Sequence, residues 1–330
     1  MSDPLITLAA ARRQLQHTPA DISSSSNPKW RHLRELLESA RERRRSGQTV
    51  LEGWHLLDAW LATGRPIRQL VIPQRTLQQL SRVSAGGRHT ISGPGERTAS
   101  SGPSDRPKTQ GREAAAHESV RRNASASAIR PETSPEQTAA NAHWLILDDR
   151  LFGELDLLPS PSPVLAVVDT PRPVLPARLG EGGDIIVLDR VQDPGNVGTI
   201  LRTAAAAGVQ TLLTTPGTAA CWAPKVLRAG MGGHFVLDIV ENVTQDALQA
   251  LAAHLPLAGT VLQGGQSLYG TDLRSPLAWV FGNEGEGIAP ALQERLGLRL
   301  TIPQAAGVES LNVAASAAVC LFEQRRQRLV

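Results

Sequence analysis

The sequence predicts an α/β protein made of two units: a C-terminal unit built on a mostly parallel sheet, and a smaller α/β unit before it. Its length of 330 residues suggests two domains at the usual size of about 100 to 200 residues each. Hydrophobic residues make up 41% of the chain but aromatic residues only 3%, so the core must be mainly aliphatic, as in packed helices and parallel sheets. After residue 183, short apolar runs alternate with helix-like segments, which is typical of a parallel sheet covered on both faces.

The N-terminal unit is predicted to follow a flexible leader. Residues 1–27 are polar and contain a run of four serines, which favours an unordered segment. In 29–45 the apolar residues share one helical face and arginines occupy the others, so this segment is expected to form a basic amphipathic helix. A strand that turns into a helix is predicted for 49–62, and a further strand for 67–72.

A long segment interrupts this unit, which we expect to span residues 28–169. Residues 83–140 are rich in Ser, Gly, Pro, Arg and Ala without sustained periodicity, and such a composition buries too little apolar surface to offset chain ordering. They are therefore predicted to be a disordered insertion. Strand-like runs return at 144–147 and 164–168, and the proline-containing residues 170–183 are predicted to be an interdomain linker.

The C-terminal unit is expected to cover residues 184–330. Its predicted strands are 185–189, 211–214, 236–240, 258–262, 277–281 and 299–302. Its predicted helices are 197–207, 224–229, 244–254, 290–295 and 312–328. Ligands of such sheets usually lie beyond the carboxyl ends of the strands, so the loops that follow the strands are the first place to look for chemistry.

Composition narrows the functional classes. All but three of the 34 basic residues are arginine, whose planar guanidinium suits phosphate groups, although a net charge of +3 is also compatible with an ordinary solvated surface. Cys221 and Cys320 are the only cysteines, too few for a disulfide framework or a tetrahedral zinc site, and typical of a reducing compartment. No apolar run reaches the roughly 18 to 20 residues that cross a bilayer. We therefore expect a cytoplasmic protein without a metal.

The first of three conspicuous loops follows the strand predicted at 185–189. An Asp-Pro-Gly turn is followed by Asn196, which can cap a helix or orient a ligand, and by Gly198, which permits a close backbone approach. Arg202 lies six residues after Asn196. The alternative interpretation is that Asn196 only caps the helix and that Arg202 forms a surface ion pair.

The second and third loops also follow predicted strands. The glycine-rich turn in 279–288 carries Gly282 and Glu284; its glycine spacing differs from that of a dinucleotide-binding loop, and this argues against nicotinamide chemistry. The alternative here is a tight turn with acidic decoration. The third loop joins Ile302 to an alanine-rich helix and carries Ser310, Leu311 and Asn312 at the helix mouth, where Ser310 could simply be the N-cap.

Taken together, in this order and at these separations, the three loops resemble those of the SpoU family of RNA 2′-O-ribose methyltransferases, also called the TrmH family. The similarity covers nearly all of 184–330 and includes the segment 224–235. The resemblance implies an α/β-knot, in which the C-terminal part threads through a loop to make a deep trefoil knot. It also implies S-adenosylmethionine as the methyl donor, homodimerisation through the knotted domain, and an RNA substrate.

The resemblance assigns residues to two groups. Main-chain groups that hold the methyl donor correspond to Gly282, Ile302 and Leu311. Residues that line the meeting place of ribose and methyl group correspond to Asn196, Arg202, Glu284, Ser310 and Asn312. A guanidinium is almost always protonated, so a phosphate-gripping role for Arg202 is favoured over that of a base, which some descriptions of the family prefer. Gln304, where methionine is common in the family, and the alanine run 204–207 depart from the usual pattern.

The N-terminal unit resembles, more loosely, the small substrate-binding domain that often precedes this catalytic domain and is itself similar to a ribosomal RNA-binding protein. Arg31, Arg34 and the arginines of 41–45 would contact phosphates. This domain favours ribosomal RNA as the substrate. The alternatives are a tRNA 2′-O-methyltransferase and a non-catalytic RNA-binding factor of ribosome assembly.

Overall fold

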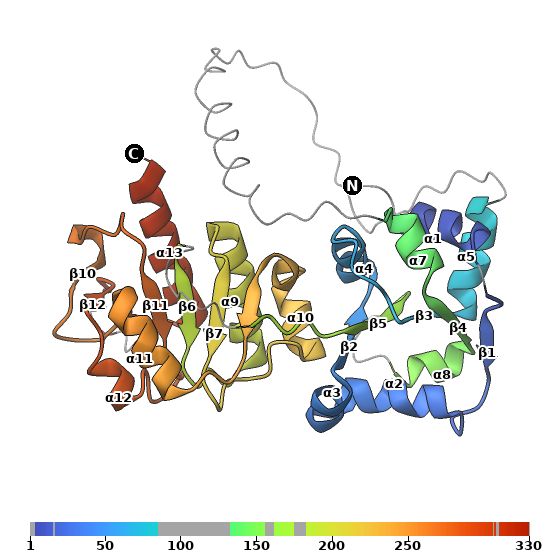
Figure 1. The fold of residues 1–330 in the computed structure, drawn as a ribbon, viewed down its shortest axis with the longest axis horizontal. Helices are drawn as coiled ribbons and strands as arrows, with labels where there is room; N and C mark the ends of the chain where they lie inside the picture. Colours follow the sequence, from blue (N-terminus) through green and yellow to red (C-terminus); the bar gives the residue numbers. More distant parts are fainter. Residues whose placement is uncertain are drawn as a thin grey trace, which may run out of the picture.

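The computed structural model describes residues 4–15, 17–84, 133–155, 162–174, 183–305, 307 and 310–329, and it contains two sheets, one in each half of the chain (Figure 1). Most of the predicted insertion, residues 85–132, and the linker residues 175–182 lie outside the described part. The predicted α/β class with a mostly parallel sheet is confirmed.

The N-terminal sheet has five strands in the order β1-β4-β3-β5-β2. They are β1 (Ala20–Ile22), β4 (His143–Leu147), β3 (Gln69–Pro73), β5 (Leu165–Asp169) and β2 (Gln48–Glu52). β1, β4 and β3 run parallel, whereas β5 is antiparallel to both of its neighbours. Alternate residues face opposite sides: Leu70 and Ile72 join one apolar cluster and Val71 joins another, as the pleat of a strand requires.

Helices cover both faces of this sheet. One face carries α1 (Pro4–Arg13), α4 (Trp54–Leu61), α5 (Gln74–Ser84) and α7 (Pro135–Ala140), and the other carries α2 (Pro28–Glu38) and α8 (Asp149–Gly153). The predicted basic helix over 29–45 is two helices, because Ser39 ends α2 and caps α3 (Ala40–Ser46) by accepting a hydrogen bond from the backbone N–H of Glu42 at 3.2 Å.

The prediction of a flexible leader over residues 1–27 is wrong. Helix α1 is part of the fold: the side chain of Leu8 is fully buried, and the helix packs against α5 and α7 (Figure 1). β1 adds a fifth strand to the sheet. The predicted insertion also extends too far. Its last residues form α7, which buries Ala139 and Ala140. The main partners of α1, which are α5 and α7, lie more than 60 residues away in sequence, so local composition could not indicate this packing.

The C-terminal sheet has seven strands, all parallel, in the order β10-β12-β9-β11-β6-β7-β8. They are β6 (Ile185–Leu188), β7 (Thr211–Thr214), β8 (Asp238–Val240), β9 (Leu257–Thr260), β10 (Gln266–Ser267), β11 (Ala278–Phe281) and β12 (Leu298–Thr301). Because every pair is parallel, all carboxyl ends lie along one edge. The chain builds outward from β6 to β8 and then crosses to the other side, so β6 and β11 flank a switch point in strand order.

Two layers of helices enclose this sheet. Helices α9 (Pro194–Ala207), α10 (Pro224–Gly230) and α13 (Val313–Leu329) belong to one apolar cluster, and α11 (Gln245–His254) and α12 (Pro290–Gln293) belong to the other. α9 and α10 are in close contact at Gly198, where a Cβ atom would lie 2.6 Å from the carbonyl oxygen of Val226. This contact requires glycine.

Helix α13 is fastened at the amino edge of the sheet. Gln324, which is 2% exposed, accepts a hydrogen bond from Trp279 Nε1 at 2.7 Å and donates one to Asp184 Oδ1 at 3.0 Å. Arg328 Nη2 also donates to Asp184 Oδ1, at 2.9 Å. Asp184 directly precedes β6, so these bonds join the end of the last helix to the start of the first strand of this sheet.

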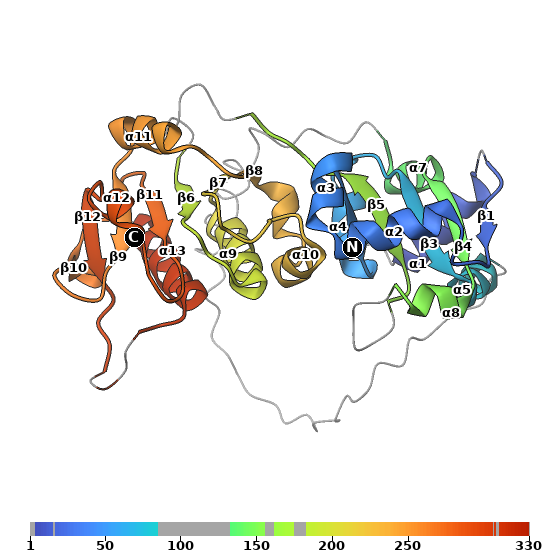
Figure 2. The same cartoon turned by 90° about the horizontal axis from the view of Figure 1, so that it is seen from below.

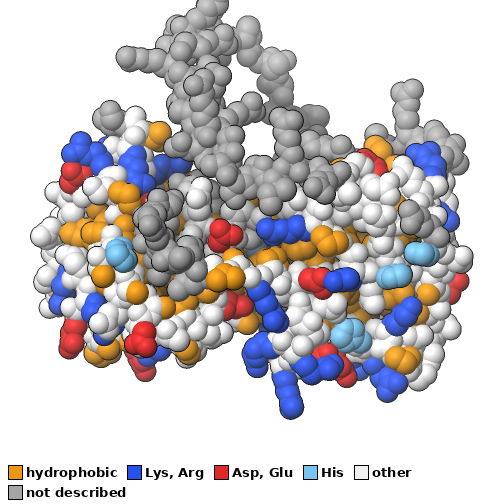
Figure 3. Space-filling model, viewed as in Figure 1, with side chains coloured by type: hydrophobic (Ala, Val, Ile, Leu, Met, Phe, Trp, Pro, Cys, Tyr) orange, Lys and Arg blue, Asp and Glu red, His pale blue; other side chains and the backbone are white. Residues whose placement is uncertain are grey.

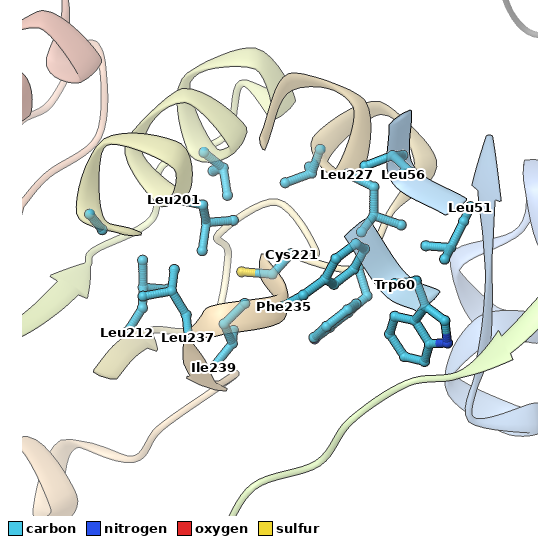
Figure 4. Packing of buried hydrophobic residues seen from close by; sticks show 14 of the residues in the cluster. Leu51, Leu56, Trp60, Leu201, Leu212, Cys221, Leu227, Phe235, Leu237 and Ile239 are labelled. Carbon is cyan, nitrogen blue, oxygen red and sulfur yellow. The ribbon is translucent and has the colours of Figure 1, made fainter. Parts of the chain in front are cut away.

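The two halves share one apolar core, although each has its own sheet (Figures 1 and 2). Figure 4 shows Leu51, Leu56 and Trp60 of the N-terminal half packed towards Leu227 and Phe235 of the other half. The rings of Trp60 and Phe235 meet edge to face with centroids 5.1 Å apart.

Polar contacts accompany this shared core. Thr49 Oγ1 donates a buried hydrogen bond to the carbonyl oxygen of Trp222 at 2.7 Å, and Arg228 pairs with Glu52 at 3.0 Å. Both contacts join β2 to the segment around α10, so the N-terminal half is held directly against a helix that packs on α9.

Candidate functional site

Hydrogen bonds join the three conspicuous loops at the carboxyl edge of the seven-stranded sheet. Asn196, in the first turn of α9, donates from Nδ2 to Glu284 Oε1 at 2.9 Å. Asn312, just before α13, donates from its own Nδ2 to Asn196 Oδ1, also at 2.9 Å. Asn196 therefore connects the loops that follow β11 and β12, and these three side chains form the centre of the candidate site.

Glu284 is held by the main chain as well. Its Oε2 accepts a hydrogen bond from the backbone N–H of Gln192, and its Oε1 accepts one from that of Asp193, both at 3.1 Å. Burial acts to raise the pKa of this carboxyl, but the hydrogen bonds from the Asn196 amide and from the two backbone N–H groups outweigh burial and lower it. Glu284 is therefore an ionised acceptor at neutral pH.

The turn that carries Glu284 is shaped by Asn283. Backbone hydrogen bonds run in both directions between Asn283 and Gly287, at 3.0 and 2.9 Å, and Asn283 Oδ1 accepts from the N–H groups of Gly285 and Glu286. Gly282 lies against the returning arm of this turn, and a Cβ there would lie 2.2 Å from the backbone nitrogen of Ile288. No side chain fits at this position.

The structure decides two of the alternatives left open by the sequence. Asp193, and not Asn196, is the N-cap of α9, because its side chain accepts from the backbone N–H of Asn196 at 2.8 Å. Asn312 caps α13, since its Oδ1 accepts from the N–H groups of Ala314 and Ala315 at 2.9 and 3.2 Å. Ser310 is exposed and forms no hydrogen bond with any other described residue.

Arg202 stands apart from the three bonded side chains. It lies on α9 and is exposed, and its side chain makes neither a hydrogen bond nor an ion pair with any described residue. The alternative interpretation of Arg202 was a surface ion pair, and Arg202 forms none with the described residues. Its backbone is tightly packed, since a Cβ at Gly233 would lie 3.0 Å from Arg202 Cα. The guanidinium is thus free to meet an anion.

Three main-chain positions at the same edge fit a bound methyl donor. Among the described residues, the backbone groups of Gly282, Ile302 and Leu311 find no hydrogen-bond partner, although Gly282 and Ile302 are buried. Buried backbone groups in native proteins are nearly always paired, so these positions have donors and acceptors to offer to a ligand. A nucleoside with several donors and acceptors meets this requirement.

Arg190, which follows β6, contributes contacts that no sequence motif predicts. Its side chain pairs with Glu286 in the second loop, and its carbonyl oxygen accepts from Asn283 Nδ2 at 2.9 Å. Arg190 and Glu286 are 96 positions apart, so no local sequence pattern indicates their contact.

One group of metal-ligating side chains lies elsewhere. His32, Glu35 and Glu42 in the N-terminal half bring their ligand atoms within 4.8 Å of one another. Arg45 already binds both carboxylate oxygens of Glu42 at 2.7 Å, which leaves that carboxylate little capacity for a cation.

Among the described residues, no helix is long and apolar enough to cross a bilayer.

Comparison with known proteins agrees with the geometry. A sequence model of the SpoU rRNA Methylase family matches residues 184–322. An uncharacterized tRNA/rRNA methyltransferase of Synechocystis is 31% identical over 94% of both chains. The 23S rRNA (guanosine(2553)-2′-O)-methyltransferase RlmP of Bacillus subtilis is 32% identical over 60% of this chain and 79% of its own length.

The fold as a whole also matches a solved structure. The AdoMet-bound rRNA methyltransferase of Sinorhizobium meliloti superposes with a TM-score of 0.70 at 23% identity, over 96% of this chain and all of the other. The likeness therefore includes the N-terminal half. The family match, the relative aligned over nearly its full length and the loops joined by Asn196 together show that the chain belongs to the SpoU family of RNA methyltransferases.

Proposed function

We propose that the protein transfers a methyl group from S-adenosylmethionine to a ribose 2′-hydroxyl, and that its substrate is ribosomal RNA. As a member of the SpoU family it is an RNA methyltransferase that uses this donor. The main support for the site is the hydrogen-bonded link from Asn312 through Asn196 to Glu284, which fixes three loops around unpaired backbone groups. The ribosomal substrate is supported by the likeness to RlmP.

The donor would be held by the main chain of Gly282, Ile302 and Leu311, and when bound it supplies an electrophilic methyl group. The remaining work is positioning, since aligning the hydroxyl oxygen with the methyl carbon can supply much of the rate gain. The free guanidinium of Arg202 would bind the phosphate next to the reacting ribose and so place the hydroxyl. A guanidinium has five donors and no acceptor, so we assign it no role as a base.

The other candidate side chains complete the proposed site. Asn196 and Asn312 keep their amides fixed through the bonds described above, and ionised Glu284 accepts three hydrogen bonds that order the loop before α9. Ser310 has a free hydroxyl beside Leu311, where it can donate to the ribose or to the donor.

We also propose the knot and the dimer. β11 lies between β6 and β9, and the chain after β12 returns across the carboxyl edge to reach α9 before it enters α13. This path is compatible with a threaded C-terminus. Leu311 at the site and Phe322 and Leu329 on α13 are exposed apolar side chains, which suits an interface between two copies of the domain.

The N-terminal half would bind RNA through a subset of its arginines. Arg31, Arg41 and Arg44 are free to contact phosphates, since no described acidic group binds their guanidinium groups. Arg34 is paired with Glu38 at 2.9 Å, Arg45 with Glu42, and Arg43 donates to the carbonyls of Leu36 and Leu37 at the end of α2. Figure 3 shows Lys and Arg side chains gathered over the lower middle of the molecule, where Figure 1 places α3.

The proposed domain boundaries follow from this division. We assign RNA binding to residues up to 169 and methyl transfer to residues 184–330, and we place the protein in the cytoplasm on its cysteine usage.

Mapping of 2′-O-methylated nucleotides in ribosomal RNA and tRNA, from cells with and without the gene, tests the function. We expect one ribosomal site to lose its mark. Loss of a tRNA mark instead would correct the substrate, and identical maps in all stable RNAs would favour a non-catalytic assembly factor.

Substitutions of single arginines test the site and the RNA contacts. Arg202→Ala should keep donor affinity but lose about 100-fold or more in turnover, whereas Arg295→Ala, a change of an arginine outside the site, should retain activity. Arg41→Ala and Arg44→Ala should each weaken RNA binding and reduce the slope of log affinity against log salt by about 1, whereas the already paired Arg34 should contribute less.

A further inference from the structure

We propose that Arg190 is a positioning residue of the methyl-donor site, which locks the glycine-rich turn of 282–288 onto the loop that leads into α9. The inference rests on the proposed use of this turn to hold S-adenosylmethionine. Arg190 itself need not touch the donor, because its contacts are with the two loops themselves, where they follow β6 and β11.

Three contacts join Arg190 to the turn. Its Nη1 donates to Glu286 Oε2, its Nη2 donates to the carbonyl oxygen of Gly287 at 3.4 Å, and its own carbonyl oxygen accepts from Asn283 Nδ2 at 2.9 Å. Side chain and backbone of one residue thus hold three positions of the same turn. The hydrogen bond to Glu286, more than any other contact, raises the pKa of Arg190.

The backbone of Arg190 is in an uncommon conformation. Its φ of +56° lies in the left-handed region, which residues other than glycine and asparagine rarely adopt. Its N–H donates to Thr215 Oγ1 at 3.0 Å, which helps to hold this conformation. Strained residues that the surroundings hold in place are often found at functional sites, and here the strain directs the side chain towards the turn.

Arg190 also balances a buried charge. The preceding residue, Asp189, is 2% exposed, and its carboxylate lies 3.6 Å from Arg190 Nε. Asp189 accepts hydrogen bonds from Thr215 Oγ1 at 3.0 Å and from the backbone N–H of Ala289 at 2.7 Å. The guanidinium therefore lies between a buried carboxylate at the end of β6 and an exposed one in the turn.

These contacts act on the donor site because the turn carries its main elements. Gly282 is at the start of the turn and Glu284 within it, and Glu284 in turn accepts from the backbone of residues 192 and 193, two and three positions after Arg190. Loss of the Arg190 side chain would remove its bonds to Glu286 and Gly287 and leave the loops joined by the Glu284 bonds and by backbone and Asp189 contacts. The unpaired backbone of Gly282 would then no longer be held in one orientation for the donor.

The test is calorimetric binding of S-adenosylhomocysteine to the full-length protein and to single variants. Arg190→Ala should weaken binding about 10-fold or more, the size expected for loss of a charge-assisted hydrogen bond, and Arg190→Lys should recover part of it. Glu286→Gln should weaken binding less. Arg274→Ala is the matched control, since Arg274 forms a similar ion pair with Asp272 at 2.6 Å elsewhere in the same domain and should bind as wild type does.

Kinetics separate positioning from general damage. For Arg190→Ala we expect the KM for S-adenosylmethionine to rise while kcat at saturating donor stays close to that of wild type. A merely structural role would lower the active fraction, and hence kcat, with KM unchanged, and would contradict the inference. Arg190→Gly accepts the positive φ and provides the same test should the alanine variant not fold.

Two further outcomes are decisive. Binding by folded Arg190→Ala within twofold of wild type would overturn the role of Arg190 and leave the proposed function intact. Failure of the wild-type protein to bind S-adenosylhomocysteine would instead defeat the proposed use of the site, and the inference with it.

Discussion

The two edges of the seven-stranded sheet are built on opposite principles. At the amino edge, Gln324 satisfies Trp279 and Asp184 in a buried network with few free polar groups. At the carboxyl edge, the linked side chains of Glu284 and Asn312 are exposed and that of Asn196 is half-buried, and buried backbone groups of Gly282 and Ile302 lack described partners. One edge completes its own hydrogen bonding, whereas the other keeps capacity for a ligand.

This difference shows how one sheet can be both stable and reactive. A satisfied buried network stabilises the fold but offers nothing to a substrate, and unpaired groups bind substrates at a cost in stability. The satisfied groups and the unpaired groups lie at opposite ends of the strands. Substitutions at the amino edge should therefore change stability, and substitutions at the carboxyl edge should change binding. Three predictions follow the comparison from the largest expected effect to the smallest.

Gly282→Ala should have the largest effect, and it should fall on binding. The added methyl would lie 2.2 Å from Ile288 N and 2.5 Å from Gly287 O, both backbone atoms, so the turn must move. We expect donor affinity to fall by about 100-fold or more, the cost of displacing a binding element by about 1 Å.

Gly285→Ala is the matched control within the same turn. Its nearest contact would be Asn283 Oδ1 at 3.7 Å, which is ordinary van der Waals distance. Titration calorimetry on both variants compares the two positions directly. Equal affinities would show that the position of the turn does not matter for the donor.

Gln324→Ala should act on stability alone. It removes a 2% exposed side chain and leaves the indole N–H of Trp279 buried without its acceptor. We expect the free energy of unfolding to fall by about 2 kcal/mol, measured by denaturant titration, with donor affinity unchanged in the folded protein. Gln249→Ala, at an exposed position of α11, should change stability little. A large loss of donor affinity in Gln324→Ala would erase the distinction between the edges.

Glu284→Gln should have the smallest effect on stability, present at neutral pH and absent in acid. Because the folded-state pKa of Glu284 is lowered, its contribution is present above the ordinary glutamate pKa and is lost as the pH falls through the folded-state value. Wild type should therefore lose more thermal stability than the variant between neutral and acidic pH in the absence of donor. Parallel melting curves of the two proteins across that range would contradict this.

The sequence was most informative where a motif and a regular period coincide. The strand predicted at 211–214 is β7 with the same bounds, and the helix predicted at 244–254 begins one residue later as α11. The three loops could be identified because the family constrains their residue types, and the structure does join Asn196, Glu284 and Asn312. Their roles in chemistry, and that of Arg202, stay predictions.

Sequence reasoning was weakest where the partners lie far away in sequence. The packing of α1 is not predictable locally, because its burial depends on α5 and α7, and β10, with only two residues, is too short to show a period. The contacts of Arg190 are not predictable either, since they depend on a positive φ and on Glu286 from another strand end. Such features depend on tertiary packing, which composition and periodicity do not encode.

The apolar core shared by the two halves has a consequence for RNA recognition. With Trp60 set against Phe235 and Thr49 bonded to Trp222, the arginines of α3 and the proposed site at the carboxyl edge are joined through one shared core. An RNA that engages both must therefore match a span fixed in advance by the protein. Selection of a nucleotide can then depend on the folded shape of the RNA as much as on the identity of the base.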